Sequence, residues 1–278
     1  MSGPVERHAE IGIAVAQLAG TKDVAANLAA IERLCAQAAD EGAKVVVFPE
    51  AVMYDFTASA EEIADAARQH GYLFEDRIRT LAAQSRIAIA AGMYAKGDGP
   101  LARNVIIVAG PGGEILQRYQ KIHLYDAFHY RESDKNERAS LKPDFGELAM
   151  FDLGGFRFGL LNCYDIRFPE MARLLVDRGA DVLLVASGWV TGPLKEMHWE
   201  TLLRARAIEN TCFVAASCQP APHSVGLSMV VDPSGVVAGA VAGGEGLVLA
   251  RLRMERLADV RRILPCLAHR RYAISAGQ

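Results

Sequence analysis

The chain has 278 residues, of which 51% are apolar and 23% are charged, so it is long enough to bury a large hydrophobic core. Its net charge of −3 and pI near 6.2 provide no basic surface of the kind that binds nucleic acid or an anionic membrane. A small molecule or a second copy of the chain is therefore the expected partner.

The first half of the chain is predicted to begin with a βαβ unit. Apolar, β-branched residues indicate strands at 11–18 and 45–48, and apolar residues at helical spacing indicate a helix at 24–38. The elements expected after this unit are helices at 61–70 and 74–84 and strands at 87–94, 105–109 and 116–120. This alternation is typical of α/β layering.

The second half shows the same pattern. A strand at 156–161, a helix from 171 and a strand at 182–185 form another βαβ unit. Segments 40–45 and 177–182 share Asp, Gly, Ala and Val in register, with each Gly suited to the end of a helix. The later elements expected are a helix at 196–209 and strands at 211–216, 226–231 and 247–252. Two similar halves predict a two-sheet sandwich in one domain, residues 1–278.

Segment 125–143 has no regular period and is rich in charge, so it is predicted to be a long loop. Loops of this length within compact domains are usually functional or disordered.

Three polar residues stand at the ends of predicted strands: Glu50, Lys121 and Cys163. Alone, each has an ordinary structural reading. A Cys at a strand end is commonly a small core residue, a Glu after Pro can pair with a helix N-terminus, and a Lys is commonly a solvated charge. Together they indicate a reactive site, because α/β folds place reacting groups at strand ends.

The three residue types also suit one reaction. A thiol with a pKa of about 8.5 is mostly protonated at neutral pH, so it needs a base or a nearby positive charge. Glu50 is the candidate base, and burial behind Pro49 is expected to move its pKa towards neutrality. The Lys121 ammonium is the candidate partner for an anionic tetrahedral oxygen.

The motifs around these residues, Val47-Phe48-Pro49-Glu50, 119–124 (YQKIHL) and 162–170 (NCYDIRFPE), resemble the nitrilase (carbon-nitrogen hydrolase) superfamily in order and spacing. The likeness continues through His198-Trp199, the run at 204–210 and the turn at 231–235, and so covers nearly the whole chain.

The resemblance implies a four-layer αββα sandwich that forms a homodimer or a higher even oligomer. It assigns Glu50, Lys121 and Cys163 as the catalytic triad and Glu132 as a further glutamate of the pocket, although the sequence around Glu132 by itself reads as a solvated charge run. In the implied mechanism, Cys163 attacks a carbonyl and forms a thioester, with the oxyanion held by Lys121 and the backbone N–H of Tyr164. No metal or organic cofactor is expected.

The Cys-Tyr-Asp sequence at 163–165 is similar to the amidase branch that includes ω-amidase and deaminated-glutathione amidase, and therefore favours an amide over a nitrile. The alternatives are an N-carbamoyl amino-acid hydrolase, then a nitrilase, then a non-catalytic binding protein that keeps the fold. The residues predicted to contact the substrate, which can also be read as ordinary half-buried aromatics, are Tyr54, His129, Tyr130, Tyr164 and Trp189.

Two features depart from the family pattern. Asn162 stands where an apolar residue is common, and segment 143–146 (PDFG) replaces a Pro-Gly turn, both near the pocket in the family. Arg167 is expected to pair with Glu170 or another acid, with a substrate carboxylate as the alternative partner.

Five cysteines without a CxxC pair do not indicate a disulfide framework or a zinc site. Residues 1–10 contain no apolar targeting region, and no apolar run approaches the ~20 residues that span a bilayer. We therefore expect a soluble, cytoplasmic protein.

Overall fold

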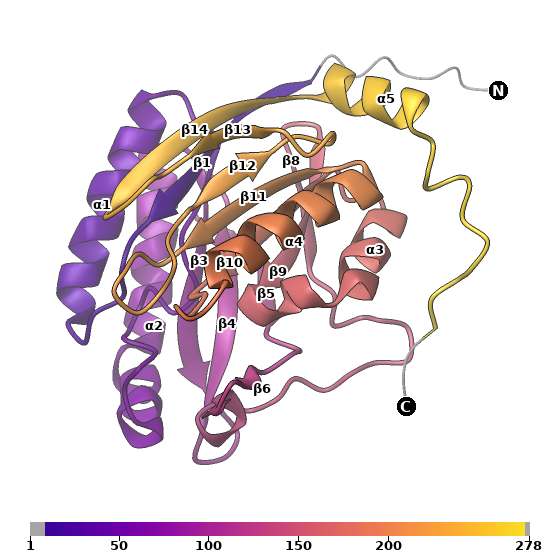
Figure 1. Cartoon of the computed structure of the whole chain (residues 1–278). Helices are drawn as coiled ribbons and strands as arrows, with labels where there is room; N and C mark the ends of the chain where they lie inside the picture. The colour runs from indigo at the N-terminus through magenta and orange to yellow at the C-terminus, as the bar shows by residue number, and fades with distance from the viewer. Residues whose placement is uncertain (1–8, 276–278) are drawn as a thin grey trace.

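Two six-stranded sheets lie face to face in the computed structural model, which describes residues 9–275 (Figure 1). The first sheet has the order β14 (Gly246–Arg253), β1 (Glu10–Gln17), β2 (Val45–Val47), β3 (Ala88–Lys96), β4 (Ala102–Ala109), β5 (Ile115–Gln120). The second has the order β13 (Val237–Ala240), β12 (Met229–Val231), β11 (Phe213–Cys218), β10 (Val182–Ser187), β9 (Phe156–Asn162), β8 (Met150–Leu153).

Helices cover the outer face of each sheet. The first sheet carries α1 (Val24–Asp40) and α2 (Ala60–Ser85), and the second carries α3 (Pro169–Asp177) and α4 (Lys195–Asn210). A further helix, α5 (Met254–Ile263), follows β14. The predicted four-layer αββα sandwich is confirmed.

The two halves repeat one topology. Strands β1, β2 and β3 are parallel and are linked by α1 and α2, just as β9, β10 and β11 are parallel and are linked by α3 and α4. Each half then adds two antiparallel strands on one side and one on the other. The matching glycines, Gly42 and Gly179, end α1 and α3 with φ of 86° and 95°, which a residue with a side chain rarely adopts.

The central strands of the first sheet, such as β1 and β2, are apolar on both faces because both faces are buried. Ile13 and Val15 of β1 face the second sheet, while the small residues Ala14 and Ala16 face α1 and α2. Because both faces of the strand contact apolar layers, its sequence is a continuous apolar run and does not alternate between polar and apolar residues. The side chains between the two sheets and under α3 and α4 form one continuous hydrophobic cluster.

Several boundaries differ from the prediction. Helix α2 is one helix, not two. Gly71 lies within it and allows it to pass close to β3, because a Cβ atom at this position would approach the Tyr94 carbonyl oxygen to 3.2 Å. Ser59 and Glu62 cap its start. Strand β12 is shorter than the predicted 226–231. Strand β13 and helix α5 were not predicted, since both are half exposed and weakly patterned.

The predicted loop at 125–143 contains a small hairpin of β6 (Asp126–Ala127) and β7 (Tyr130–Arg131), followed by a 3-10 turn, η1 (Glu132–Asp134). Within residues 9–275, no helix is both long enough and apolar enough to cross a bilayer. Of the N-terminal region predicted to lack a targeting segment, residues 1–8 lie outside the described part of the chain.

Candidate active site

Glu50 is placed by a close approach between two strands of the first sheet. It follows β2 and Pro49, and the backbone of this segment lies directly against Gly92 of β3. A Cβ atom at position 92 would lie 2.5 Å from the Glu50 Cα atom, so only glycine permits this packing. The Gln219 side chain donates to the Glu50 carbonyl oxygen at 2.7 Å and fixes the segment from the second sheet.

Cys163 begins a 3-10 turn, η2 (Cys163–Arg167), immediately after β9. Its φ of 48° lies in the left-handed region, which is uncommon for a residue with a side chain and often marks a functional position. Cys163 is 8% exposed, and its side chain lines a cavity. The Glu50 carboxylate lines the same cavity.

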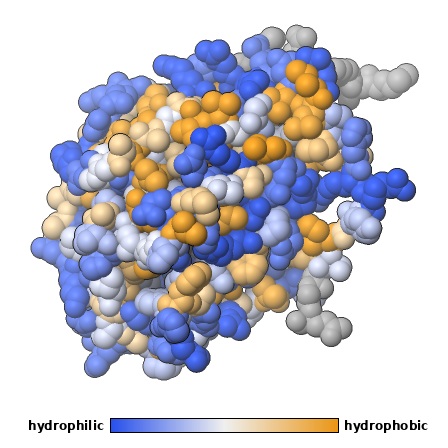
Figure 2. All heavy atoms as spheres, viewed as in Figure 1, coloured by the Kyte–Doolittle hydropathy of each residue, from blue (hydrophilic) through white to orange (hydrophobic). Residues whose placement is uncertain are grey.

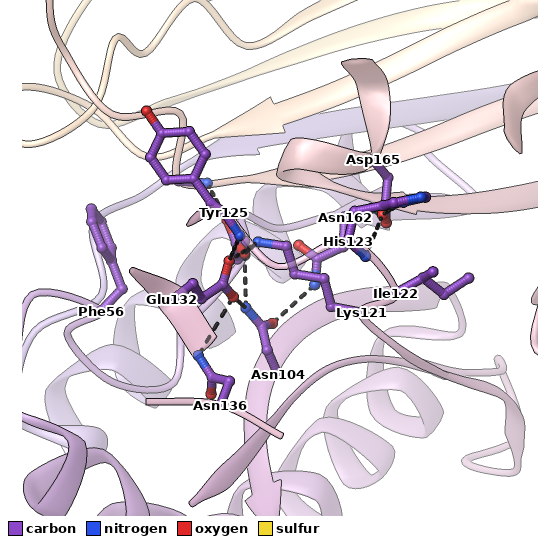
Figure 3. A network of polar contacts seen from close by, with 12 residues as sticks. Phe56, Asn104, Lys121, Ile122, His123, Tyr125, Glu132, Asn136, Asn162 and Asp165 are labelled. Atoms are coloured by element: carbon purple, nitrogen blue, oxygen red, sulfur yellow. Dashed lines mark hydrogen bonds and ion pairs between the residues drawn. The ribbon is translucent and has the colours of Figure 1, made fainter. Parts of the chain in front are cut away.

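Lys121, the first residue after β5, contacts two carboxylates, and Figure 3 shows its contact with that of Glu132. Its Nζ atom is 2.7 Å from Glu50 Oε1 and 2.7 Å from Glu132 Oε2. All three side chains are buried, with Lys121 only 1% exposed. The structure thus brings together all four predicted polar residues, including Glu132, which the local sequence alone would place in solvent.

Opposing effects set the charge states of these groups. Burial raises the pKa of Cys163 well above its usual range, and the charge of Glu50 adds to this effect. Burial also acts to raise the pKa of Glu50, but the charge of Lys121 and hydrogen bonds from Lys121 and the Gly188 N–H outweigh it, so the pKa is lowered. The expected shift of Glu50 towards neutrality was therefore wrong. The free protein holds a neutral thiol beside an ionised carboxylate.

Burial and neighbouring charges also oppose each other in setting the pKa values of Lys121 and Glu132. Burial acts to lower the pKa of Lys121, but the charges of Glu132 and Glu50 outweigh it and hold the pKa well above its usual value. Burial raises the pKa of Glu132, with only partial opposition from Lys121. Its oxygens accept hydrogen bonds from N–H groups of Lys121, Asn104, Asn136 and the Tyr125 backbone, and hydrogen bonds of this kind act against the rise.

A buried carboxylate joins the turn of Cys163 to the segment of Lys121. Asp165 accepts hydrogen bonds from the Tyr119 hydroxyl at 2.5 Å and from the Asn162 N–H at 2.8 Å, and lies 2.8 Å from His123 Nδ1. Tyr119 and His123 flank Lys121 in the chain. The Cys-Tyr-Asp sequence therefore fixes the nucleophile relative to the lysine.

The candidate residues Glu50, Lys121, Glu132 and Cys163 line one cavity. Of the predicted substrate contacts, Tyr130, Tyr164 and Trp189 line it. Tyr54 and His129 do not. Tyr54 packs against the cluster on the helix side of the first sheet, and His129 is exposed at the tip of the β6–β7 hairpin, where it has a φ of 65°.

Two cations at the cavity were not predicted as site residues. Arg167 lies over the Trp189 ring, 4.5 Å from its centroid, and its Nη2 atom is 3.4 Å from His198 Nδ1. Lys195, 5% exposed, donates to the Tyr125 hydroxyl at 2.8 Å. Within residues 9–275, neither cation forms an ion pair with a carboxylate, so the expected pairing of Arg167 with Glu170 was wrong.

The two departures from the family pattern have different positions. Asn162 is fully buried at the end of β9, where its side-chain amide meets that of Asn104. Segment 143–146 lies away from the cavity, because Arg178, at the end of α3, donates to the carbonyl oxygens of Asp144 and Phe145. Its expected place near the pocket was wrong.

The amino-acid sequence matches the carbon-nitrogen hydrolase family over residues 12–262. The chain belongs to this family. A deaminated glutathione amidase from Escherichia coli O157:H7 is 34% identical over 262 residues, which cover 94% of this chain and 97% of that protein. The likeness seen in the three motifs is confirmed.

Solved structures of similar proteins have the same fold. The Caenorhabditis elegans NitFhit protein superposes with a TM-score of 0.86 at 29% identity; the match covers 95% of this chain but 65% of NitFhit, just under two thirds. A double mutant of the amidase from Nesterenkonia sp. AN1, in complex with acrylamide, has a TM-score of 0.79 at 27% identity and covers 95% and 98% of the two chains. This protein is therefore a hydrolase of carbon-nitrogen bonds.

Among the described residues of this carbon-nitrogen hydrolase, no three His, Cys, Asp or Glu side chains are grouped as metal ligands. The cavity is lined by the thiol, the two carboxylates and the three cations described above.

Proposed function

We propose that this chain is a cysteine amidase that hydrolyses a small aliphatic amide or ω-amide to a carboxylate and ammonia, with Cys163, Glu50 and Lys121 as its catalytic residues. The observation that carries the proposal is that the Cys163 thiol, the Glu50 carboxylate and the Lys121 ammonium line one cavity, with Lys121 Nζ 2.7 Å from Glu50 Oε1. Burial keeps the thiol neutral, so it requires a base, and Glu50 is a carboxylate in the same cavity.

In the first step, Glu50 takes the thiol proton as the Cys163 sulfur bonds to the carbonyl carbon. Lys121 has three N–H groups and gives two to carboxylates, so the third remains for the oxyanion together with the Tyr164 backbone N–H. The tetrahedral intermediate then expels the nitrogen, which receives its proton from Glu50 and leaves as ammonia.

In the second step, Glu50 takes a proton from water, whose oxygen attacks the thioester carbon. The carbon–sulfur bond breaks, the sulfur regains a proton and the carboxylic acid leaves. Glu132 holds Lys121 from the side opposite Glu50, so that the ammonium stays directed at the oxyanion. A nitrile gives no oxyanion in the first step, and this arrangement therefore favours amides.

The two unpaired cations favour an ω-amide, which carries a carboxylate at its other end. Arg167 and Lys195 line the same cavity as Cys163, and the Arg167 Nε atom is buried without a hydrogen-bond partner. Burial, and then the charge of Arg167, lowers the pKa of Lys195. A bound substrate carboxylate would therefore offset the repulsion between these two positive charges. The similarity to deaminated glutathione amidases agrees with such a substrate.

The test compares two four-carbon amides that differ in one carboxylate, succinamate and butyramide. Wild type is expected to hydrolyse succinamate with a kcat/KM about 10-fold higher or more, since hydrogen bonds to charged groups contribute about 1.5–3 kcal/mol. Arg167→Met should remove most of this preference while retaining activity on butyramide. Release of ammonia is measured for both, and for N-carbamoyl-β-alanine and butyronitrile.

Equal rates for succinamate and butyramide in wild type would overturn the ω-amide proposal. A higher rate with N-carbamoyl-β-alanine would favour the N-carbamoyl hydrolase, and a higher rate with butyronitrile would favour the nitrilase. No activity on any of the four would support a binding protein.

We also propose that residues 1–278 form one catalytic domain that assembles as a homodimer or a higher even oligomer. Figure 2 shows apolar residues among polar ones on the face that carries α4. The large exposed apolar residues near α4, the turn after β12 and the end of α5 are Met197, Ile208, Val236, Ile263 and Leu264. Light scattering is expected to give at least twice the chain mass of 30.0 kDa, and a value equal to it would contradict the proposal.

The proposed location is the cytoplasm. All five cysteines are free thiols, and four of them are buried in the fold, which is compatible with a reducing compartment. Fractionation of the producing cells tests this: enzyme found outside the cytoplasmic fraction would contradict it.

A further inference from the structure

Asn104 contacts every segment that carries a proposed catalytic group. It is the third residue of β4, the strand between β3 and β5, and is 2% exposed. Its backbone carbonyl oxygen accepts a hydrogen bond from the Lys121 N–H at 2.9 Å. Its side-chain Nδ2 atom donates to Glu50 Oε1 at 2.8 Å. The same atom donates to Glu132 Oε1 at 3.0 Å (Figure 3).

The fourth contact reaches the segment of the nucleophile. Because Asn104 Nδ2 faces two carboxylates, its Oδ1 atom must face the other way, towards Asn162. One terminal atom of the Asn162 amide lies 2.9 Å from it, and donates to it when that atom is the nitrogen; the other terminal atom lies 3.2 Å from Glu50 Oε1. Asn162 immediately precedes Cys163. One amide therefore links the base, the second glutamate and the strand that ends at the nucleophile.

The hydrogen bonds to Glu50 determine which of its oxygens can accept a proton. Oε1 receives two donors, Lys121 Nζ at 2.7 Å and Asn104 Nδ2 at 2.8 Å, and these occupy its two lone pairs. Oε2 receives the Gly188 N–H at 2.9 Å, which leaves one lone pair. The thiol proton is therefore directed to Oε2.

An amide is well suited to this position. Glu50 and Glu132 are two buried negative charges that share the single positive charge of Lys121, so they repel each other. The two N–H groups of an amide stabilise both carboxylates without adding a charge. An acid at this position would add a third acceptor, and an apolar residue would leave Glu50 Oε1 with one donor.

We propose that Asn104 is a positioning residue of the amidase, which acts through Glu50 by occupying Oε1 and directing Oε2 to the Cys163 thiol, and which Asn162 orients in turn. This inference rests on the proposed amidase function. It assigns a role to Asn104 and explains the polar residue at position 162.

The main test is Asn104→Ala. We expect kcat to fall about 100-fold with KM changed less than about threefold, because the base loses its alignment while the outer cavity is intact. In a plot of kcat/KM against pH, the acid limb, where activity rises as the base ionises, should also move to higher pH. Loss of a donor disfavours ionised Glu50, whose pKa then rises, so a higher pH is needed to ionise the base.

The charged or titratable groups that face Glu50 and stay in place in this variant are Lys121, Glu132, Cys163, Tyr94 and Tyr130. The matched control is Asn210→Ala, which removes a fully buried amide at the end of α4 that donates to the Arg206 carbonyl oxygen. The control should lower the melting temperature without moving kcat or the acid limb.

A second variant keeps the test decisive if Asn104→Ala does not fold. Asn162→Ala leaves Asn104 in place but removes the donor that orients it, so the acid limb should move in the same direction by a smaller amount. Alkylation of Cys163 by iodoacetamide depends on the same base and requires no amide turnover. Its rate is measured by peptide mass spectrometry, and both variants should lower this rate at pH 7.

Wild-type kcat, acid limb and alkylation rate in Asn104→Ala, or in Asn162→Ala where only that variant folds, would overturn the positioning role. If wild type hydrolyses no amide but the variants still slow alkylation of Cys163, the positioning role stands and the proposed substrate fails.

Discussion

Replacement of Cys163 by alanine is expected to abolish amide hydrolysis and to leave the fold intact. The loss should be about 10⁴-fold or more, since removal of a nucleophile eliminates the covalent route altogether. The fold should tolerate the change, because only a sulfur atom at the wall of a cavity is lost and the left-handed backbone at φ 48° is retained in the variant. Ammonia release and thermal unfolding of the same preparation measure both effects.

The control for this experiment is Cys212→Ala. Cys212 is fully buried away from the cavity, and burial raises the pKa of its thiol to about 12, so it is an unreactive core residue. The control should keep kcat while losing some stability. Substantial turnover by a folded Cys163→Ala variant would contradict the assignment of the nucleophile.

The second large effect is expected for Lys121→Met, which should be inactive and less stable by about 3–5 kcal/mol at neutral pH. Lys121 is the shared counter-ion of Glu50 and Glu132, and removal of one partner from a buried ionic group leaves uncompensated charge. In this variant the folded-state pKa values of both carboxyl groups rise above their unfolded values of about 4.3. The loss of stability should therefore grow as the pH rises and shrink as it falls towards 5.

Chemical denaturation at pH 5 and at pH 8 measures this dependence. The double variant Lys121→Met/Glu132→Gln should regain part of the stability, because one buried charge is removed, but it should stay inactive. The matched control is Lys22→Met, which removes an exposed lysine paired with Glu62 and should change stability far less than Lys121→Met does. Wild-type stability of Lys121→Met at pH 8 would contradict the shared ion pair.

The strand-end residues were predictable because their signal is local. Glu50, Lys121 and Cys163 each follow a run of strand-forming residues, and each lies in a motif that resembles the family. The apolar runs also predicted the sheet layers, because the central strands of both sheets are buried on both faces. The family motifs added Glu132, whose own sequence context indicates an exposed position.

The rest depended on contacts between distant parts of the chain. Asn104 stands near the start of an apolar strand, and only the fold places it between Glu50 and Glu132, 54 and 28 residues away. The charge of Lys121, 71 residues from Glu50, reverses the effect of burial on the pKa of that carboxyl group. Arg167 has an acid three residues later in the chain, yet it turns to Trp189 and the cavity instead.

The central claim is that hydrolysis passes through a thioester on Cys163, and partitioning between water and hydroxylamine tests it most directly. Propionamide and 4-nitrophenyl propionate should give the same propionyl thioester after their leaving groups have departed. With a fixed concentration of hydroxylamine, the account predicts one ratio of propionohydroxamate to propionate from both substrates. A ratio that depends on the leaving group would contradict a common acyl-enzyme.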